Sequence, residues 1–191
     1  MMRSKCIAEM CTMIGVALSY FHIAAAQDSS QSLMRKATSA CGPAEIRFAV
    51  SAAPSSFVVP VSHDQAKVYF IGHTLKGSFS GPVIRLGIDG RWVGAVKGST
   101  YIVIPVMPGT HHFCAQVQGR GADGYFGSDV ALNVFTLHSG ESHYLAIDSP
   151  DDVSLGVLTL DALNADEAKL LIALSRQAVP HQKEMKIGGK R

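Results

Sequence analysis

The sequence has no large excess of positive or negative charge, and this balance excludes one large class of partner. Seventeen lysines and arginines stand against fifteen aspartates and glutamates in 191 residues, which gives a formal net charge of +2. Proteins that bind nucleic acid concentrate positive charge on one face or in one run of the chain. The near balance of charge, without basic blocks in the body of the chain, therefore predicts no nucleic-acid partner.

Long apolar runs are also scarce. The one such run covers residues 10–26, follows the basic residues Arg3 and Lys5, and ends in three alanines. This pattern is typical of a secretory signal peptide, so we predict a signal peptide over residues 1–26 with cleavage after Ala26. The alternative is an uncleaved membrane anchor, since a tilted span needs about 17 residues. No second run follows, so we expect a mature chain without a transmembrane span, located in the periplasm or secreted.

Cysteine is the third scarce residue, with four in the chain. Cys6 and Cys11 lie in the predicted signal peptide, which leaves Cys41 and Cys114. Two cysteines in an exported chain most simply form one disulfide, and the alternative is two unrelated buried thiols. Closing so long a loop would stabilise the fold by roughly 4 kcal/mol according to the chain-entropy relation.

Short β patterns separated by turn residues fill most of what remains. We predict a polar, flexible lead-in over residues 27–40, a β domain over 41–178 and a disordered basic tail over 179–191. The most informative stretch, residues 83–118, predicts four strands of an antiparallel meander with turns at Asp89-Gly90, 97–99 and Pro108-Gly109. Many short strands with regular turns indicate a mainly β protein, an antiparallel β-sandwich of immunoglobulin-like or similar type.

Five further strands and one helix complete the prediction. The strands are expected at residues 45–50, 67–72 (a central strand), 130–137, 144–147 and 153–160. Asn164 and Glu167 form a capping-box pattern at the start of a C-terminal helix that Pro180 would end. Pro105 places its strand at a sheet edge or near the end of the strand, and an exposed edge there would allow two copies of the chain to pair.

One resemblance adds to this reading. The run DGRWVGAVKGSTYIVIPVMPGTHHFCAQVQ, which begins at Asp89, resembles the core of an uncharacterised family of secreted bacterial proteins, a domain of unknown function. The Ala-Cys-Gly-Pro opening at residues 40–43, Val68-Tyr69-Phe70 and the Asp-Glu-Ala of residues 166–168 agree with it. The pattern is also distantly similar to PEGA-type envelope β modules. The resemblance covers roughly residues 41–177, implies an extracytoplasmic β domain with a Cys41–Cys114 bridge, and supplies no activity.

The loop at 119–127 departs from that family pattern and contains a G-x-G-x-x-G match. A dinucleotide site needs this motif to open a helix, whereas strands are expected on both sides here, so we predict a hairpin loop and no cofactor. Such a loop can serve as a contact surface. The candidate binding residues are Arg120, Asp123, Tyr125 and Phe126 in the loop, together with Trp92 and Tyr101. Trp92, the single tryptophan, either fills the core or stands exposed as a stacking platform.

No catalytic or metal-binding constellation emerges from the spacing. His111 and His112 are adjacent in a strand and point to opposite faces, so they do not easily share a metal ion. We therefore expect a non-catalytic, envelope-associated structural or binding module whose partner is an envelope protein or a glycan. The alternative is a periplasmic metal-dependent hydrolase that uses His112, His143 and the aspartates of the 148–152 cluster (Asp148, Asp151 and Asp152).

Export and disulfide formation are tested together by the intact mass of protein purified from the exporting host. We expect a chain that begins at Gln27 and that gains the mass of two hydrogen atoms on reduction. An uncleaved chain, free thiols or a retained metal ion would contradict the prediction.

Overall fold

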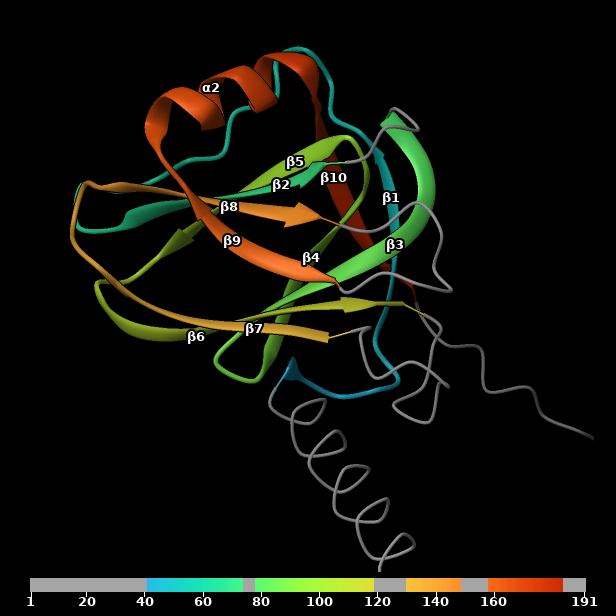
Figure 1. Cartoon of the computed structure of the whole chain (residues 1–191), viewed down its shortest axis with the longest axis horizontal. Coiled ribbons are helices and arrows are strands. Elements are labelled where there is room, and N and C mark those ends of the chain that lie inside the picture. The colour runs from blue at the N-terminus through green and yellow to red at the C-terminus, as the bar shows by residue number, and fades with distance from the viewer. Residues whose placement is uncertain (1–40, 74–77, 119–129, 149–157, 184–191) are drawn as a thin grey trace, which may run out of the picture. The chain divides into compact units, whose positions relative to one another are not determined.

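The computed structural model describes residues 41–73, 78–118, 130–148 and 158–183, all within the compact unit Ala37–Arg191. In these ranges the chain forms two β-sheets and one α-helix (Figure 1). The predicted mainly β sandwich with a C-terminal helix is therefore confirmed. In the described part of the chain, no helix has the length and apolar character needed to cross a membrane.

The larger sheet has six strands. In spatial order they are β1 (Arg47–Ala52), β10 (Arg176–Lys183), β5 (Thr100–Val106), β2 (Ala66–His73), β8 (Ser142–Asp148) and β9 (Thr159–Leu163). The strand predicted at 67–72 is central, as expected. Two of the neighbouring pairs, β2 with β8 and β5 with β10, are parallel, so the sheet is mixed rather than purely antiparallel.

The smaller sheet has four antiparallel strands. In spatial order they are β4 (Arg91–Gly98), β3 (Ser78–Ile88), β6 (Gly109–Val117) and β7 (Val130–Leu137). Alternate residues of β3 and β6 point toward the six-stranded sheet and are buried there, among them Leu86, Phe113 and Ala115. Phe113 links the two sheets, because its ring centroid lies 6.1 Å from that of Phe70 in β2.

The meander predicted for residues 83–118 is wrong beyond its first hairpin. Asp89 and Gly90 adopt positive φ angles of 50° and 77° and join β3 to β4 as expected. The chain then changes sheets twice, since β5 belongs to the six-stranded sheet and β6 returns to the four-stranded one. Both sheets share one core, so a buried row of alternating residues looks the same in either sheet. The sequence pattern therefore identified these strands without revealing their partners.

The C-terminal part of the prediction needs one correction. Helix α2 (Ala165–Leu174) begins with the predicted capping box: Asn164 Oδ1 accepts the Glu167 N–H at 2.9 Å, and the Glu167 carboxylate accepts the Asn164 N–H. However, the helix ends before Pro180, and residues 179–183 lie in β10 rather than in a disordered tail. Beyond Gln177, β10 pairs only with β1, so Pro180 can lack an N–H there without breaking a second ladder.

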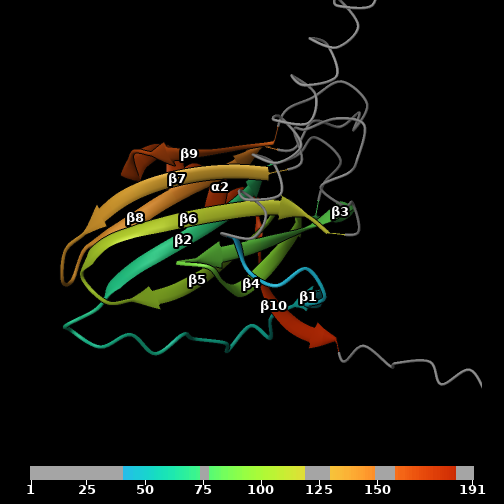
Figure 2. The ribbon, with the colours of Figure 1, turned by 90° about the horizontal axis from the view of Figure 1, so that it is seen from below.

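Asn133 closes the seam where the edges of the two sheets meet. β7 and β9 are edge strands that lie side by side in both views (Figures 1 and 2). The Asn133 amide donates to the Leu160 carbonyl of β9 at 3.0 Å, while its Oδ1 accepts the Val134 N–H at 2.8 Å. One side chain therefore satisfies backbone groups of both edges, which protects them from pairing with another chain.

Replacing this side chain should weaken the seam measurably. We expect Asn133→Ala to lower the free energy of unfolding by about 1 kcal/mol, because the part-buried Leu160 carbonyl loses its donor, whereas the exposed Val134 N–H can bond to water. Asn133→Asp keeps the acceptor for Val134 and removes the donor to Leu160, so it should separate the two contacts. Urea denaturation measures both, and an Asn133→Ala variant as stable as the wild type would contradict the assignment.

Candidate binding face of the four-stranded sheet

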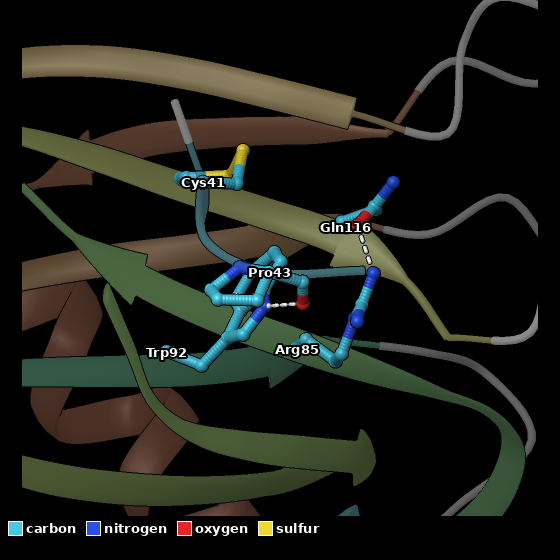
Figure 3. Close-up of a disulfide and its surroundings, with 6 residues drawn as sticks. Cys41, Pro43, Arg85, Trp92 and Gln116 are labelled. Atoms are coloured by element: carbon cyan, nitrogen blue, oxygen red, sulfur yellow. Dashed lines mark hydrogen bonds between the residues drawn. A yellow bond between two sulfur atoms is a disulfide. The ribbon is translucent and has the colours of Figure 1, made fainter. Parts of the chain in front are cut away.

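Residues 41–48, which we call the strap, run across the outer face of the four-stranded sheet (Figure 3). The strap begins at the predicted disulfide, which joins Cys41 to Cys114 of β6 with the two Cα atoms 5.4 Å apart. Cys114 points away from the core row of Phe113 and Ala115, as the alternation of β6 predicts. The bridge therefore ties the N-terminal end of the domain to the outside of the sheet.

Side chains of the sheet hold the strap along its length. The Trp92 indole Nε1 donates to the Pro43 carbonyl at 2.7 Å. Arg85 donates to the carbonyl oxygens of Ala44 and Ile46 at 3.1 and 2.8 Å. The Gln118 amide makes two hydrogen bonds to the backbone of Phe48, accepting its N–H at 2.6 Å and donating to its carbonyl at 2.9 Å. Side chains thus fix the strap as far as Ile46, and its last two residues, Arg47 and Phe48, also pair with β10 as the start of β1.

Arg85 is the central contact of this face. Only 2% of the residue is exposed, and its guanidinium also donates to Gln116 Oε1 and lies 4.2 Å from the Trp92 ring centroid. Burial, with a smaller contribution from Arg47, lowers the pKa of Arg85 to about 10, so the group is still charged at neutral pH. Among the described residues its charge is met by carbonyl oxygens and an aromatic face, both of which favour a cation.

Two glycines make the close approach of the strap achievable. A Cβ atom on Gly87 of β3 would lie 2.6 Å from the Cys41 carbonyl oxygen, and one on Gly42 would lie 2.9 Å from Trp92 Nε1. Gly42 also has a φ angle of 127°, which side-chain-bearing residues rarely adopt. Positions 42 and 87 therefore need glycine for the strap to lie close to the sheet.

Among the described residues, the strap does not reach the β7 side of the outer face, where a groove of about 560 Å³ lies. Its lining residues come from β6, β7 and the β3–β4 turn: Asp89, Gly90, His112, Phe113, Cys114, Leu132, Asn133 and Val134. Leu132 and Val134 are 52% and 50% exposed and lie opposite Cys114 and His112 in the register of β6 and β7. The disulfide therefore forms part of the groove wall, next to two apolar side chains.

The far end of the groove is polar. Asp89 Oδ2 lies 2.6 Å from His111 Nδ1, and Asp89 Oδ1 accepts the His112 N–H at 2.9 Å. Burial alone would raise the pKa of Asp89, but hydrogen bonds from His111 and from the His112 backbone, with the charges of both rings, outweigh it. The pKa of Asp89 is therefore lowered, and the carboxylate is ionised at neutral pH.

The two predicted binding residues that the structure describes, Trp92 and Tyr101, do not lie together. Trp92 is half-buried beneath Pro43, so it is neither a core residue between the sheets nor an open platform. Tyr101 lies in β5 of the other sheet, so the expected shared face of Trp92 and Tyr101 does not form. Arg120, Asp123, Tyr125 and Phe126, with the G-x-G-x-x-G loop, lie outside the described residues.

Tyr101 belongs instead to a group of tyrosines on the six-stranded sheet. Tyr69 and Tyr144 are register partners in β2 and β8, with ring centroids 4.9 Å apart. Burial raises the pKa of Tyr69, and Tyr144 and Tyr101 raise it further. The Tyr69 and Tyr144 rings pack against one another, on a sheet that does not contain Trp92.

The residues of the alternative hydrolase site are also separated. His112 lies in β6 of the four-stranded sheet, whereas His143 lies in β8 of the six-stranded sheet and contacts Glu141 at 3.2 Å. Asp148 ends β8, and Asp151 and Asp152 lie outside the described residues. Within the described ranges, no group of three or more His, Cys, Asp or Glu side chains is placed to hold a metal ion.

The residues that form this face were missed for identifiable reasons. Arg85 and Gln116 alternate with core residues, which normally indicates solvent exposure, and Leu132 and Val134 resemble ordinary strand residues. The outward position of Cys114 could have indicated the strap, because a disulfide on the outer face brings the segment around Cys41 onto that face.

No family model matches the chain, and no curated protein matches its sequence. The assignment of this face therefore rests on its own geometry.

The contribution of Arg85 to the strap can be measured directly. We expect Arg85→Met to lower the free energy of unfolding by on the order of 3 kcal/mol, because three acceptors lose their donor at once. Arg91→Met, at an exposed position in the neighbouring strand, should change it by less than about 0.5 kcal/mol. Equal stability of the two variants in urea denaturation would show that Arg85 does not hold the strap.

Proposed function

We propose that this protein is a non-catalytic, extracytoplasmic binding module that receives apolar side chains of an envelope partner in the groove beside the strap. The observation that carries the proposal is the pair Leu132 and Val134, each about half exposed on the floor of a groove of about 560 Å³. Apolar concavities of this size with a few polar groups at one end are where proteins most often bind ligands.

An extracytoplasmic location is supported by two independent features. The disulfide between Cys41 and Cys114 is typical of proteins that fold in oxidising compartments. The N-terminal sequence has the charge, apolar run and small residues of a signal peptide. The resemblance to secreted bacterial β domains agrees with both.

The chemistry of the groove favours a protein partner over a glycan. Sugars are commonly bound on exposed aromatic rings, and Trp92, which could have served, is occupied by Pro43 and Arg85. The groove presents aliphatic side chains instead, next to a wall that contains the disulfide. Because a disulfide restricts the movement of the wall, it lowers the entropy that binding costs, which suits the anchoring of one or two apolar side chains.

The hydrolase alternative has less support. His112 and His143 lie on different sheets, and no observation on the described residues favours joint chemistry by them.

The groove can be tested with an apolar fluorescent dye, 1-anilinonaphthalene-8-sulfonate, as the probe. We expect Leu132→Ser combined with Val134→Ser to weaken dye binding by about tenfold or more, since burying each aliphatic side chain contributes about 1.5–3 kcal/mol. The matched control replaces Leu170 and Leu174 by serine, because these helix residues are exposed to 62% and 70% but lie outside the groove. Unchanged binding by the groove variant, or an equal loss in the control, would overturn the proposal.

A further inference from the structure

His111 joins three separate parts of the chain behind the polar end of the groove. Its own backbone belongs to β6, its Nδ1 lies 2.6 Å from Asp89 Oδ2 in the β3–β4 turn, and its Nε2 lies 2.8 Å from the Met107 carbonyl oxygen. Met107 lies in the connection between β5 and β6. The side chain is only 16% exposed, so the ring is held between these two acceptors.

The partners of the ring define its protonation state. A carbonyl oxygen only accepts hydrogen bonds, and the Asp89 carboxylate is an acceptor as well when ionised. Neutral imidazole carries one N–H and can satisfy one of these acceptors, whereas the doubly protonated ring satisfies both. The observed geometry therefore matches the imidazolium form of His111.

We propose that the doubly protonated ring of His111 is a pH-dependent clamp that fixes the Asp89-Gly90 end of the groove. Asp89 and Gly90 line the groove, and the clamp ties their turn to the β5–β6 connection. Loss of one ring proton leaves a nitrogen lone pair facing an oxygen, so one of the two contacts breaks. The turn and the connection are then no longer joined through the ring, and the turn keeps the hydrogen bonds between Asp89 and the His112 backbone.

The charged surroundings of His111 are simple in the described part of the chain. Asp89 faces it from the β3–β4 turn, and His112 lies beside it in β6, with its own Nδ1 3.9 Å from Asp89 Oδ1. The His112 ring is 75% exposed, so solvent screens its effect. Apart from these polar groups, His111 contacts the edge of the Phe113 ring, with centroids 6.4 Å apart. The pKa of Asp89 is lowered, so its carboxylate stays ionised and remains an acceptor as the pH rises.

The clamp itself is tested on the isotopically labelled full-length chain, without any ligand. We expect long-range nitrogen–proton spectra to show hydrogens on both ring nitrogens of His111 at about pH 5 and on one at about pH 8. The amides of Gly90 and Met107 should shift over the same range. His111→Gln identifies the ring signals and should remove these amide shifts, whereas His138→Gln, in an exposed turn, should leave them intact. A singly protonated His111 at about pH 5, or amides that do not respond, would overturn the clamp.

The effect on binding rests on the proposed function of the groove and is measured separately. We expect the same apolar dye to bind the wild type about fivefold more tightly at about pH 5 than at about pH 8. His111→Gln should abolish this pH dependence, and His138→Gln should retain it. A dye that binds with equal affinity at both pH values contradicts the link to the groove. A dye that binds at neither pH contradicts the proposed function, while the ring spectra still decide whether the clamp exists.

Discussion

The buried guanidinium of Arg85 is the contact on which the outer face of the four-stranded sheet depends. It donates to two strap carbonyls and to Gln116, and it packs on the ring of Trp92, which itself holds Pro43. A buried cation is costly unless its donors find acceptors. The strap supplies two acceptors and Gln116 a third, whereas the buried Nε of Arg85 has no hydrogen-bond partner among the described residues. Moving the strap would remove two of the three acceptors, so the burial of Arg85 depends on the position of the strap.

The groove follows from where the strap lies. The disulfide and Arg85 fix the strap over β3, β4 and part of β6, and in the described part of the chain the strap does not cover Leu132 and Val134. The same disulfide that anchors the strap forms part of the groove wall. The groove is therefore bounded by the disulfide on one side and by the Asp89-Gly90 turn, which His111 contacts, at the other end.

Local features were predictable from the sequence and long-range ones were not. The Asp89-Gly90 hairpin and the Asn164 cap each follow from a few neighbouring residues, and both are confirmed. The position of β5 in the six-stranded sheet and the pairing of β10 with β1 depend on contacts between residues that are distant in the sequence. The alternation of apolar and polar residues does not indicate which sheet a strand joins. It also predicts that Arg85 faces solvent, because the pattern contains no information about the strap that covers this residue.

The most direct test of the strap is the hydrogen-exchange rate of the Trp92 indole N–H. Trp92 is the single tryptophan of the chain, so its indole signal is unambiguous, and the N–H donates to the Pro43 carbonyl of the strap. We expect slow exchange in the oxidised protein and fast exchange once the Cys41–Cys114 bridge is reduced. Fast exchange in the oxidised protein would show that the strap does not lie on Trp92, and would contradict the central claim.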